Sequence, residues 1–160
     1  MLIQNGADVD RVDNYGNTLL RSTAYVRVPQ LLIDNGAKVN HVNYSGETAL
    51  MRAALLDHVS VAQLLIENGP SVHHIDNYRR TALMQAVSNG HSSVAQSLID
   101  NGALVNHIDS KRGTALMLRL GHVEIGELLT KHDANVNRGG IHGETALTSS
   151  ARNCYLHFAR

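Results

Sequence analysis

The sequence predicts an all-α solenoid of stacked helix-turn-helix units joined by short hairpin-like turns. Two independent markers recur along the chain, and such self-similarity is the signature of a repeat architecture. The first marker is Asn-Gly before a small residue or proline, at Gly6, Gly36, Gly69 and Gly102, with a degenerate copy at Asp133-Ala134. The second is threonine before an apolar pair, at Thr18, Thr48, Thr81, Thr114 and Thr145. Both series advance in steps of 30, 33, 33 and 31 residues.

The clearest unit, residues 43–75, begins with a turn and a short helix. The turn, Asn43-Tyr44-Ser45-Gly46, is rich in turn-forming residues. Thr48 follows, and its hydroxyl can accept a hydrogen bond at the start of a helix. Helix-forming residues then extend over 49–56, and Asp57-His58 is expected to end this helix. We therefore expect the first helix of the unit at Ala49–Leu56.

The second half of this unit predicts another helix and a connection to the next turn. Val61, Ala62, Leu64 and Leu65 recur at the spacing of one helical face. Gly69 is expected to end this helix, over 61–67, in a left-handed conformation. A short extended stretch over 71–75 is expected to lead into the following turn.

Helices of about eight or nine residues are too short to be stable alone in water. Neighbouring units must therefore stack and bury the apolar faces of one another. We assign the whole chain to one array, with complete repeats at 13–42, 43–75, 76–108 and 109–139, a partial repeat at 1–12 and an incomplete one at 140–160. Since apolar helical segments stand at both ends, we expect a monomer or a part of a longer repeat chain.

These units resemble the ankyrin repeat family over essentially the whole chain. The residues that carry the resemblance are Gly46-Glu47-Thr48-Ala49-Leu50, Ala53-Ala54, Asn68-Gly69 and Val72 in one unit, and Thr81-Ala82-Leu83, Gly90-His91, Asn101-Gly102-Ala103 and Val105-Asn106 in the next. The resemblance implies an ankyrin-repeat solenoid. It also implies a concave surface of turn tips and first helices on which protein partners usually dock.

The chain departs from the family pattern at several points. The family's Thr-Pro-Leu-His is Thr-Ala-Leu-Met here, as at Thr81 to Met84. The first complete unit is three residues short between Ala24 and Leu31, and the fourth is two short between Met117 and Gly121. Gly126 in the second helix of the fourth unit costs about 1 kcal/mol relative to alanine. We expect the fourth unit to be the least stable.

Composition restricts the function further. Fourteen basic and fourteen acidic residues balance, which removes the usual electrostatic reason to expect nucleic-acid binding. No apolar run is long enough to span a membrane, so we expect a soluble protein. The chain has a single cysteine, Cys154, which favours a reducing compartment, and we expect the protein inside the cell, in the cytoplasm. Cys154 itself is expected to fill space as a small apolar side chain.

The polar residues that recur in every unit are interpreted as structural. His41, His74 and His107 form one series, and His58, His91 and His122 form another. Repeats stack about 8–10 Å apart, so successive histidines are too distant to share a zinc ion easily. Asp13, Asn43, Asp76 and Asp109 are expected to accept backbone N–H groups within their own turns, and Met51, Met84 and Met117 to fill the core. We predict no catalytic residue, no metal site and no cofactor.

The binding hypothesis concerns side chains that the scaffold leaves free. Three turn tips carry tyrosine, and tyrosine and arginine are the residues best suited to anchor an interface. Arg79, Arg80, Lys111 and Arg112 add a basic patch. The residues predicted to contact the partner are Tyr15, Tyr44, Glu47, Leu55, Tyr78, Arg80, Ser88, Asn89, Lys111 and Arg112.

The leading interpretation is a non-catalytic module that binds a protein partner, without membrane insertion. An alternative is a targeting or regulatory segment of a larger enzyme or effector whose catalytic domain lies outside this chain. A third interpretation, nucleic-acid binding through the basic tips, predicts a steep dependence of affinity on salt concentration.

Overall fold

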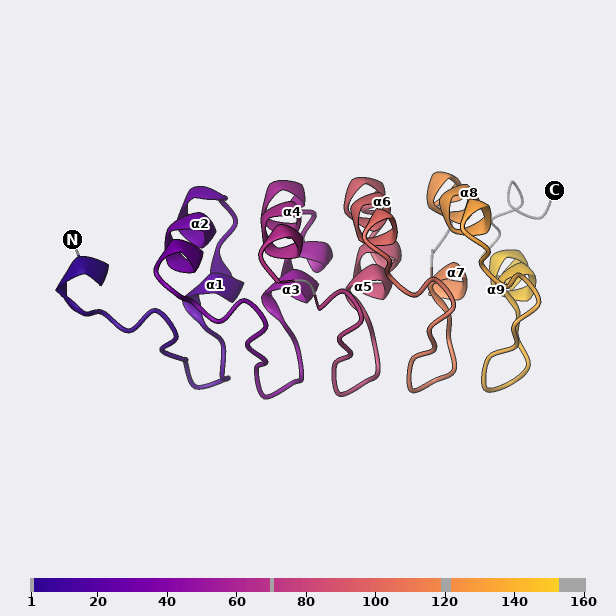
Figure 1. Ribbon diagram of the computed structural model, residues 1–160. Helices are drawn as coiled ribbons and strands as arrows, with labels where there is room; N and C mark the ends of the chain where they lie inside the picture. Colours follow the sequence, from indigo (N-terminus) through magenta and orange to yellow (C-terminus); the bar gives the residue numbers. More distant parts are fainter. Residues whose placement is uncertain (1, 70, 119–121, 153–160) are drawn as a thin grey trace.

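The computed structural model describes residues 2–69, 71–118 and 122–152, with side chains as far as residue 151. Short helices joined by turns form an elongated array in this part of the chain, with η1 at one end and α9 at the other (Figure 1). The elements are the 3₁₀ helix η1 (Ile3–Asn5) and the α-helices α1 (Leu19–Ser22), α2 (Arg27–Asp34), α3 (Ala49–Leu55), α4 (Val59–Glu67), α5 (Ala82–Ser88), α6 (Ser92–Asp100), α7 (Ala115–Leu118), α8 (Val123–Lys131) and α9 (Ala146–Arg152). This confirms the predicted fold class; Cys154 lies outside the described residues.

The helices form two parallel rows. The odd-numbered helices α1 to α9 stand in one row, the even-numbered helices α2 to α8 stand in the other, and the turns project from one side of the array (Figure 1). Neighbouring helices pack together along each row, and α1, α3, α5 and α7 also pack against α2, α4, α6 and α8 of the other row. The array is thus a solenoid whose contacts join nearest neighbours.

Threonine side chains cap α3 and α5, and Thr48 is the cap that the sequence predicts, whereas Thr18 makes no capping side-chain hydrogen bond at the start of α1. Thr48 Oγ1 accepts the backbone N–H of Met51 at 3.3 Å, and Thr81 Oγ1 accepts that of Met84 at 3.2 Å. Both threonines are buried, so these bonds satisfy donors that water cannot reach. Helices α3 and α4 correspond to the two helices predicted for the clearest unit, and α4 begins two residues earlier than predicted.

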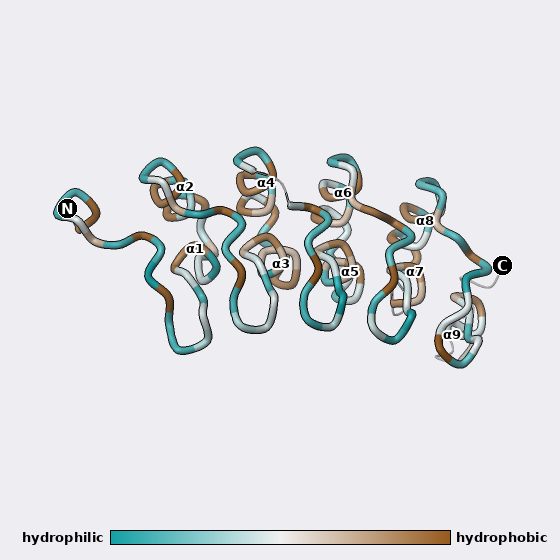
Figure 2. The backbone as a smooth tube through the Cα atoms, turned by 60° about the horizontal axis from the view of Figure 1, so that its bottom comes forward, coloured by the Kyte–Doolittle hydropathy of each residue, from teal (hydrophilic) through white to brown (hydrophobic). Residues whose placement is uncertain are grey.

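The core lies between the units and consists of small and branched apolar side chains. Leu83, Val94 and Leu98 are fully buried, and each belongs to a different turn of α5 or α6. Met51 and Met84 are also buried, while Met117 is half-buried, which confirms that the methionine series packs inside the array. Figure 2 shows this division, with hydrophobic segments in the helices and mostly hydrophilic residues along the turns.

The first unit carries a shortened first helix. Helix α1 has four residues where α3 and α5 have seven, because the first unit lacks three residues between Ala24 and Leu31. Helix α7 is also described over four residues, and the residues that follow, 119–121, lie outside the description. Gly126 is buried within α8. The expected low stability of the fourth unit stays a prediction.

The extended stretch predicted over residues 71–75 was wrong. The backbone N–H of His74 donates to the carbonyl of Ser71 at 3.0 Å, which closes a tight turn. Val72 within this turn is buried against the core. A turn, and not an extended segment, therefore places this apolar valine against the core. Alternation of apolar and polar residues over so few positions does not distinguish a turn from an extended segment.

Gly46, in the turn that precedes α3, is expected to be essential for the stacking of units. Gly46 has φ of +78°, and a Cβ there would lie 2.8 Å from the backbone nitrogen of Asn77 in the next turn. Gly46→Ala is therefore expected to lower the free energy of unfolding by about 2 kcal/mol, from left-handed strain together with a displaced neighbour. Gly36→Ala is the control, because Gly36 has φ of +86° and open space around it.

Thermal and urea unfolding followed by circular dichroism would measure both variants. The control should lose only the conformational contribution, about 1 kcal/mol. Equal losses for the two alanines would contradict a steric contribution from the adjacent turn.

Candidate protein-binding surface

Five similar turns form one edge of the array. In each turn the N–H of the first residue donates to the carbonyl four residues later, at 2.8–3.0 Å. We number these turns from one to five. They cover residues 13–17, 43–47, 76–80, 109–113 and 140–144.

One side-chain oxygen organises each of the first four turns. The atom is the Oδ1 of Asp13, Asn43, Asp76 or Asp109, and it accepts the backbone N–H groups two and four residues later, at 2.7–3.0 Å. This confirms the structural interpretation of the four residues. At Asp13, which is exposed, the hydrogen bonds from the side chain and backbone of Asn17 hold the carboxyl pKa below its usual value.

Backbone hydrogen bonds tie successive turns into a row. Tyr44 N–H donates to the Tyr15 carbonyl at 3.1 Å, and Ser110 N–H donates to the Tyr78 carbonyl at 2.9 Å. Between the second and third turns, Asn77 N–H donates to the Ser45 carbonyl at 3.1 Å. The turn tips therefore stand at fixed positions relative to one another.

The first histidine series reinforces this row. The Nε2 atoms of His41, His74 and His107 lie 2.8–2.9 Å from the carbonyl oxygens of Gly16, Gly46 and Arg79. Each carbonyl belongs to the turn that begins the same unit, and since a carbonyl only accepts, the imidazole donates. These histidines are structural, and each holds the end of its unit, just before the next turn, against the turn at the start of that unit.

The second histidine series lies at the starts of α4, α6 and α8. His91 Nε2 donates to the carbonyl of Leu55 in the preceding unit at 3.1 Å. Its Nδ1 lies 3.9 Å from the carboxylate of Asp57. Across the described part of the chain, no three His, Cys, Asp or Glu side chains come together as a metal site.

The three tip tyrosines are the most prominent exposed side chains of the row. Tyr15 and Tyr44 are each 73% exposed, and Tyr78 is 62% exposed. The ring of Tyr44 lies against Gly16 of the first turn, where an added Cβ would lie 2.8 Å from Cδ1. The guanidinium of Arg80 stands 5.1 Å from the centroid of the Tyr78 ring. The rings of Tyr44 and Tyr78 each lie against another residue of the row, while most of their surface faces solvent.

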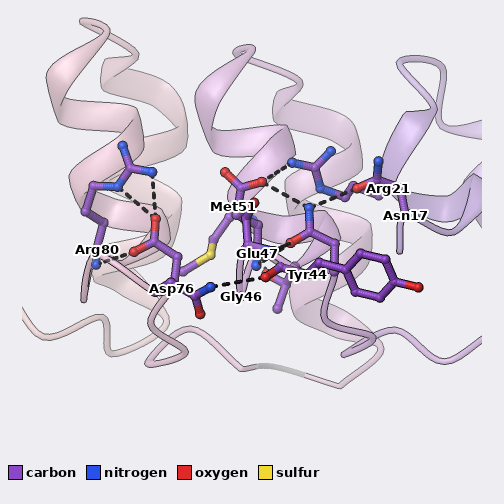
Figure 3. Close-up of polar contacts among 12 residues, drawn as sticks. Asn17, Arg21, Tyr44, Gly46, Glu47, Met51, Asp76 and Arg80 are labelled. Carbon is purple, nitrogen blue, oxygen red and sulfur yellow. Dashed lines mark hydrogen bonds and ion pairs between the residues drawn. The ribbon is translucent and has the colours of Figure 1, made fainter. Parts of the chain in front are cut away.

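Glu47, a predicted contact residue, is engaged in the scaffold. Its carboxylate forms an ion pair with Arg21 of α1 and accepts a hydrogen bond from Asn43 Nδ2 at 3.1 Å (Figure 3). Both charged side chains are less than 20% exposed. The sequence interpretation did not single out Arg21, although it occupies the position that methionine holds in the next three units.

Arg80, another predicted contact residue, is also paired. Its Nε and a terminal nitrogen each lie 2.7 Å from Oδ2 of Asp76, whose side chain is fully buried (Figure 3). The Arg80 side chain remains 37% exposed. Glu47 therefore holds its turn to α1, Arg80 closes its own turn, and both present only part of their surface to solvent.

The remaining predicted residues lie in two places. Lys111 and Arg112 are exposed at the tip of the fourth turn. Leu55, Ser88 and Asn89 lie at the ends of α3 and α5 that are farthest from the turns, and Asn89 Nδ2 donates to the Gln85 carbonyl at 2.8 Å. The tip residues and the helix-end residues are thus separated by roughly the length of these seven-residue helices, about 10 Å at a rise of 1.5 Å per residue.

A different exposed surface covers the N-terminal end of the array. A hollow of about 950 Å³ there is lined by apolar side chains that include Leu19, Val28 and Leu31. Val28 is 40% exposed, whereas the residues at its position in the next two units, Val61 and Val94, are 2% and 0% exposed. This end face has the chemistry of a stacking face and is distinct from the turn tips.

No helix within residues 2–69, 71–118 and 122–152 has the length and apolarity that crossing a membrane requires.

Comparisons with known proteins identify the repeats. The chain matches the family model described as ankyrin repeats (3 copies) over residues 24–109, and again over 83–160. No curated protein matches the chain. Ankyrin repeats are generally protein–protein interaction modules, and domains built from them are typically non-catalytic. With matched residues extending from 24 to 160 and helical pairs stacked in two rows, this chain belongs to the ankyrin repeat family.

Proposed function

We propose that this chain is a non-catalytic module that binds one protein partner through its row of turn tips and the adjoining ends of the first helices. The observation that carries the proposal is the set of three exposed tyrosines, Tyr15, Tyr44 and Tyr78, in consecutive turns. Backbone hydrogen bonds between turns fix the backbone that carries these rings, so binding would have to order side chains but not the turns themselves.

The chemistry of the tips supports this assignment. A tyrosine ring offers a large apolar contact area with only two side-chain torsions to fix, and it carries a hydroxyl that can hydrogen-bond to a partner. Lys111 and Arg112 place charge next to this aromatic row. An aromatic centre with charged neighbours is the usual composition of an interface hot spot.

Replacing two of these rings is the direct test. Tyr44→Ala with Tyr78→Ala is expected to abolish measurable binding of the partner, since truncating a hot-spot residue typically costs 2 kcal/mol or more, roughly thirtyfold in affinity for each ring. The fold should be retained, because both rings are mostly exposed. The partner would be captured from a host lysate, identified by mass spectrometry and titrated by calorimetry.

Tyr25→Ala is the matched control. Tyr25 is 83% exposed and lies in the connection between α1 and α2, outside the turn tips. Its loss should leave the affinity unchanged. If the double variant bound the partner as tightly as the unmodified protein, the tips would not be the binding surface.

A further inference from the structure

Two arginines occupy backbone positions that glycine holds in the other turns. The fourth residue of the turn is Gly16, Gly46 or Gly143 in the first, second and fifth turns, with φ of +75° to +78°. In the third and fourth turns the same position is Arg79, with φ of +59°, and Arg112, with φ of +61°. A side chain with a Cβ is disfavoured in this left-handed region, and such positions concentrate at functional sites.

Three of the four cations of these two turns form no ion pair with a described residue, the exception being Arg80. Arg79, Lys111 and Arg112 are exposed, and none of them forms an ion pair with any described residue. The two carboxylates of these turns are engaged, because Asp76 pairs with Arg80 and Asp109 accepts backbone N–H groups of its own turn. The tips therefore carry unneutralised positive charge, although the whole chain is formally neutral.

Part of the negative charge lies in the other row of helices. Asp34, Glu67 and Asp100 stand at the C-terminal ends of α2, α4 and α6. Each carboxylate accepts a hydrogen bond from a glutamine four residues earlier, at 2.6–2.9 Å. These carboxylates lie in the second row of helices, whereas Arg79, Lys111 and Arg112 form a local cluster of exposed cations at two adjacent tips.

The two basic tips are held in a fixed arrangement. Ser110 N–H donates to the Tyr78 carbonyl at 2.9 Å, and His107 Nε2 donates to the Arg79 carbonyl at 2.9 Å. The first bond runs between the third and fourth units, and the second holds the segment that leads into the fourth turn against the third turn. They set Tyr78, Arg79 and the cations of the fourth turn side by side, as a rigid aromatic and cationic surface.

We propose that this surface, formed by Tyr78, Arg79, Lys111 and Arg112, binds an acidic peptide segment of the protein partner. Carboxylates of the segment face the cations, where arginine can hold a carboxylate with two hydrogen bonds, and an apolar side chain of the segment packs on Tyr78. The inference rests on the proposed function and specifies the chemistry of the partner. Three exposed cations are too few for the many phosphate contacts on which nucleic-acid affinity depends.

The test begins with random peptides displayed on phage and selected on the unmodified protein. The selected peptides are expected to be enriched in Asp and Glu. The tightest acidic peptide would then be titrated by calorimetry against Arg79→Gly with Arg112→Gly. That double variant should bind roughly 2- to 30-fold more weakly, since each exposed ion pair contributes about 0.2–1 kcal/mol. Its melting temperature should be equal or higher, because glycine suits both positions.

A variant with the same loss of charge at other places is the control. Arg27→Gln with Lys131→Gln removes two cations from exposed positions on α2 and α8 and should leave the affinity unchanged. An absence of acidic enrichment, an equal loss in the control, or binding of poly(U) RNA as tight as that of the peptide would each overturn the proposal.

The outcomes also separate this inference from the proposed function. Neutral peptides whose binding depends on Tyr44 would contradict the acidic partner and leave the tip surface supported. Acidic peptides that require Arg79 and Arg112 but are indifferent to Tyr44→Ala would support the acidic segment and contradict the wider aromatic row.

Discussion

Leu98→Ala is expected to lower the free energy of unfolding by about 2–5 kcal/mol, the largest effect of any single substitution considered for this protein. Leu98 lies on α6, is fully buried and belongs to the core between units. Removing its branched end leaves a cavity that the surrounding side chains of two neighbouring units fill only partly. Urea unfolding followed by circular dichroism measures the loss.

Leu31→Ala provides the matched control, because Leu31 is a leucine of a second helix that is 52% exposed. Its replacement should cost less than about 1 kcal/mol, since little apolar area returns to water. A similar loss for both variants would mean that stability does not come from stacking between units, and the solenoid account of the energetics would fail.

Asp76→Ala is expected to lower the free energy of unfolding by about 3 kcal/mol. The buried carboxylate accepts the backbone N–H groups of Tyr78 and Arg80 and pairs with the Arg80 guanidinium. Alanine would leave those donors without an acceptor inside the third turn. The cost stays below that of a fully buried ion pair because Arg80 is partly exposed to water.

The chain itself supplies the comparison for this variant. Asn43 fills the same place in the second turn, and its Oδ1 accepts the N–H groups of Ser45 and Glu47. Asp76→Asn should therefore keep the turn and lose only the ion pair with Arg80, at about 1 kcal/mol. Asparagine as costly as alanine in thermal unfolding would show that the charge, rather than the turn geometry, accounts for the stability.

Local patterns predicted what local interactions decide. Thr48 was expected to cap a helix because a hydroxyl accepts a backbone N–H three residues later, and this interaction needs no distant partner. Asp109 was expected to organise its own turn for the same reason. The burial of Met84 followed from the regular recurrence of the units.

Local sequence patterns did not predict the interactions between units. The sequence predicts Glu47 as a turn-tip residue that contacts a partner. Only the position of α1 in the folded array brings Arg21 to its carboxylate. Arg79 was noted as part of a basic patch, but its left-handed backbone in a position held by glycine elsewhere became apparent from the structure. The comparison of equivalent turn positions in the sequence contained this signal, because arginine replaces glycine there in two turns.

The sequence by itself determined the repeat, the helices and their order, because a period of about thirty-three residues with capping and turn residues is a property of neighbouring positions along the chain. The tertiary structure alone decided which polar side chains hold the units together and which remain exposed for a partner. That choice depends on contacts between residues some 26–36 positions apart, such as Arg21 with Glu47 and His91 with Leu55, and stacking brings those residues together.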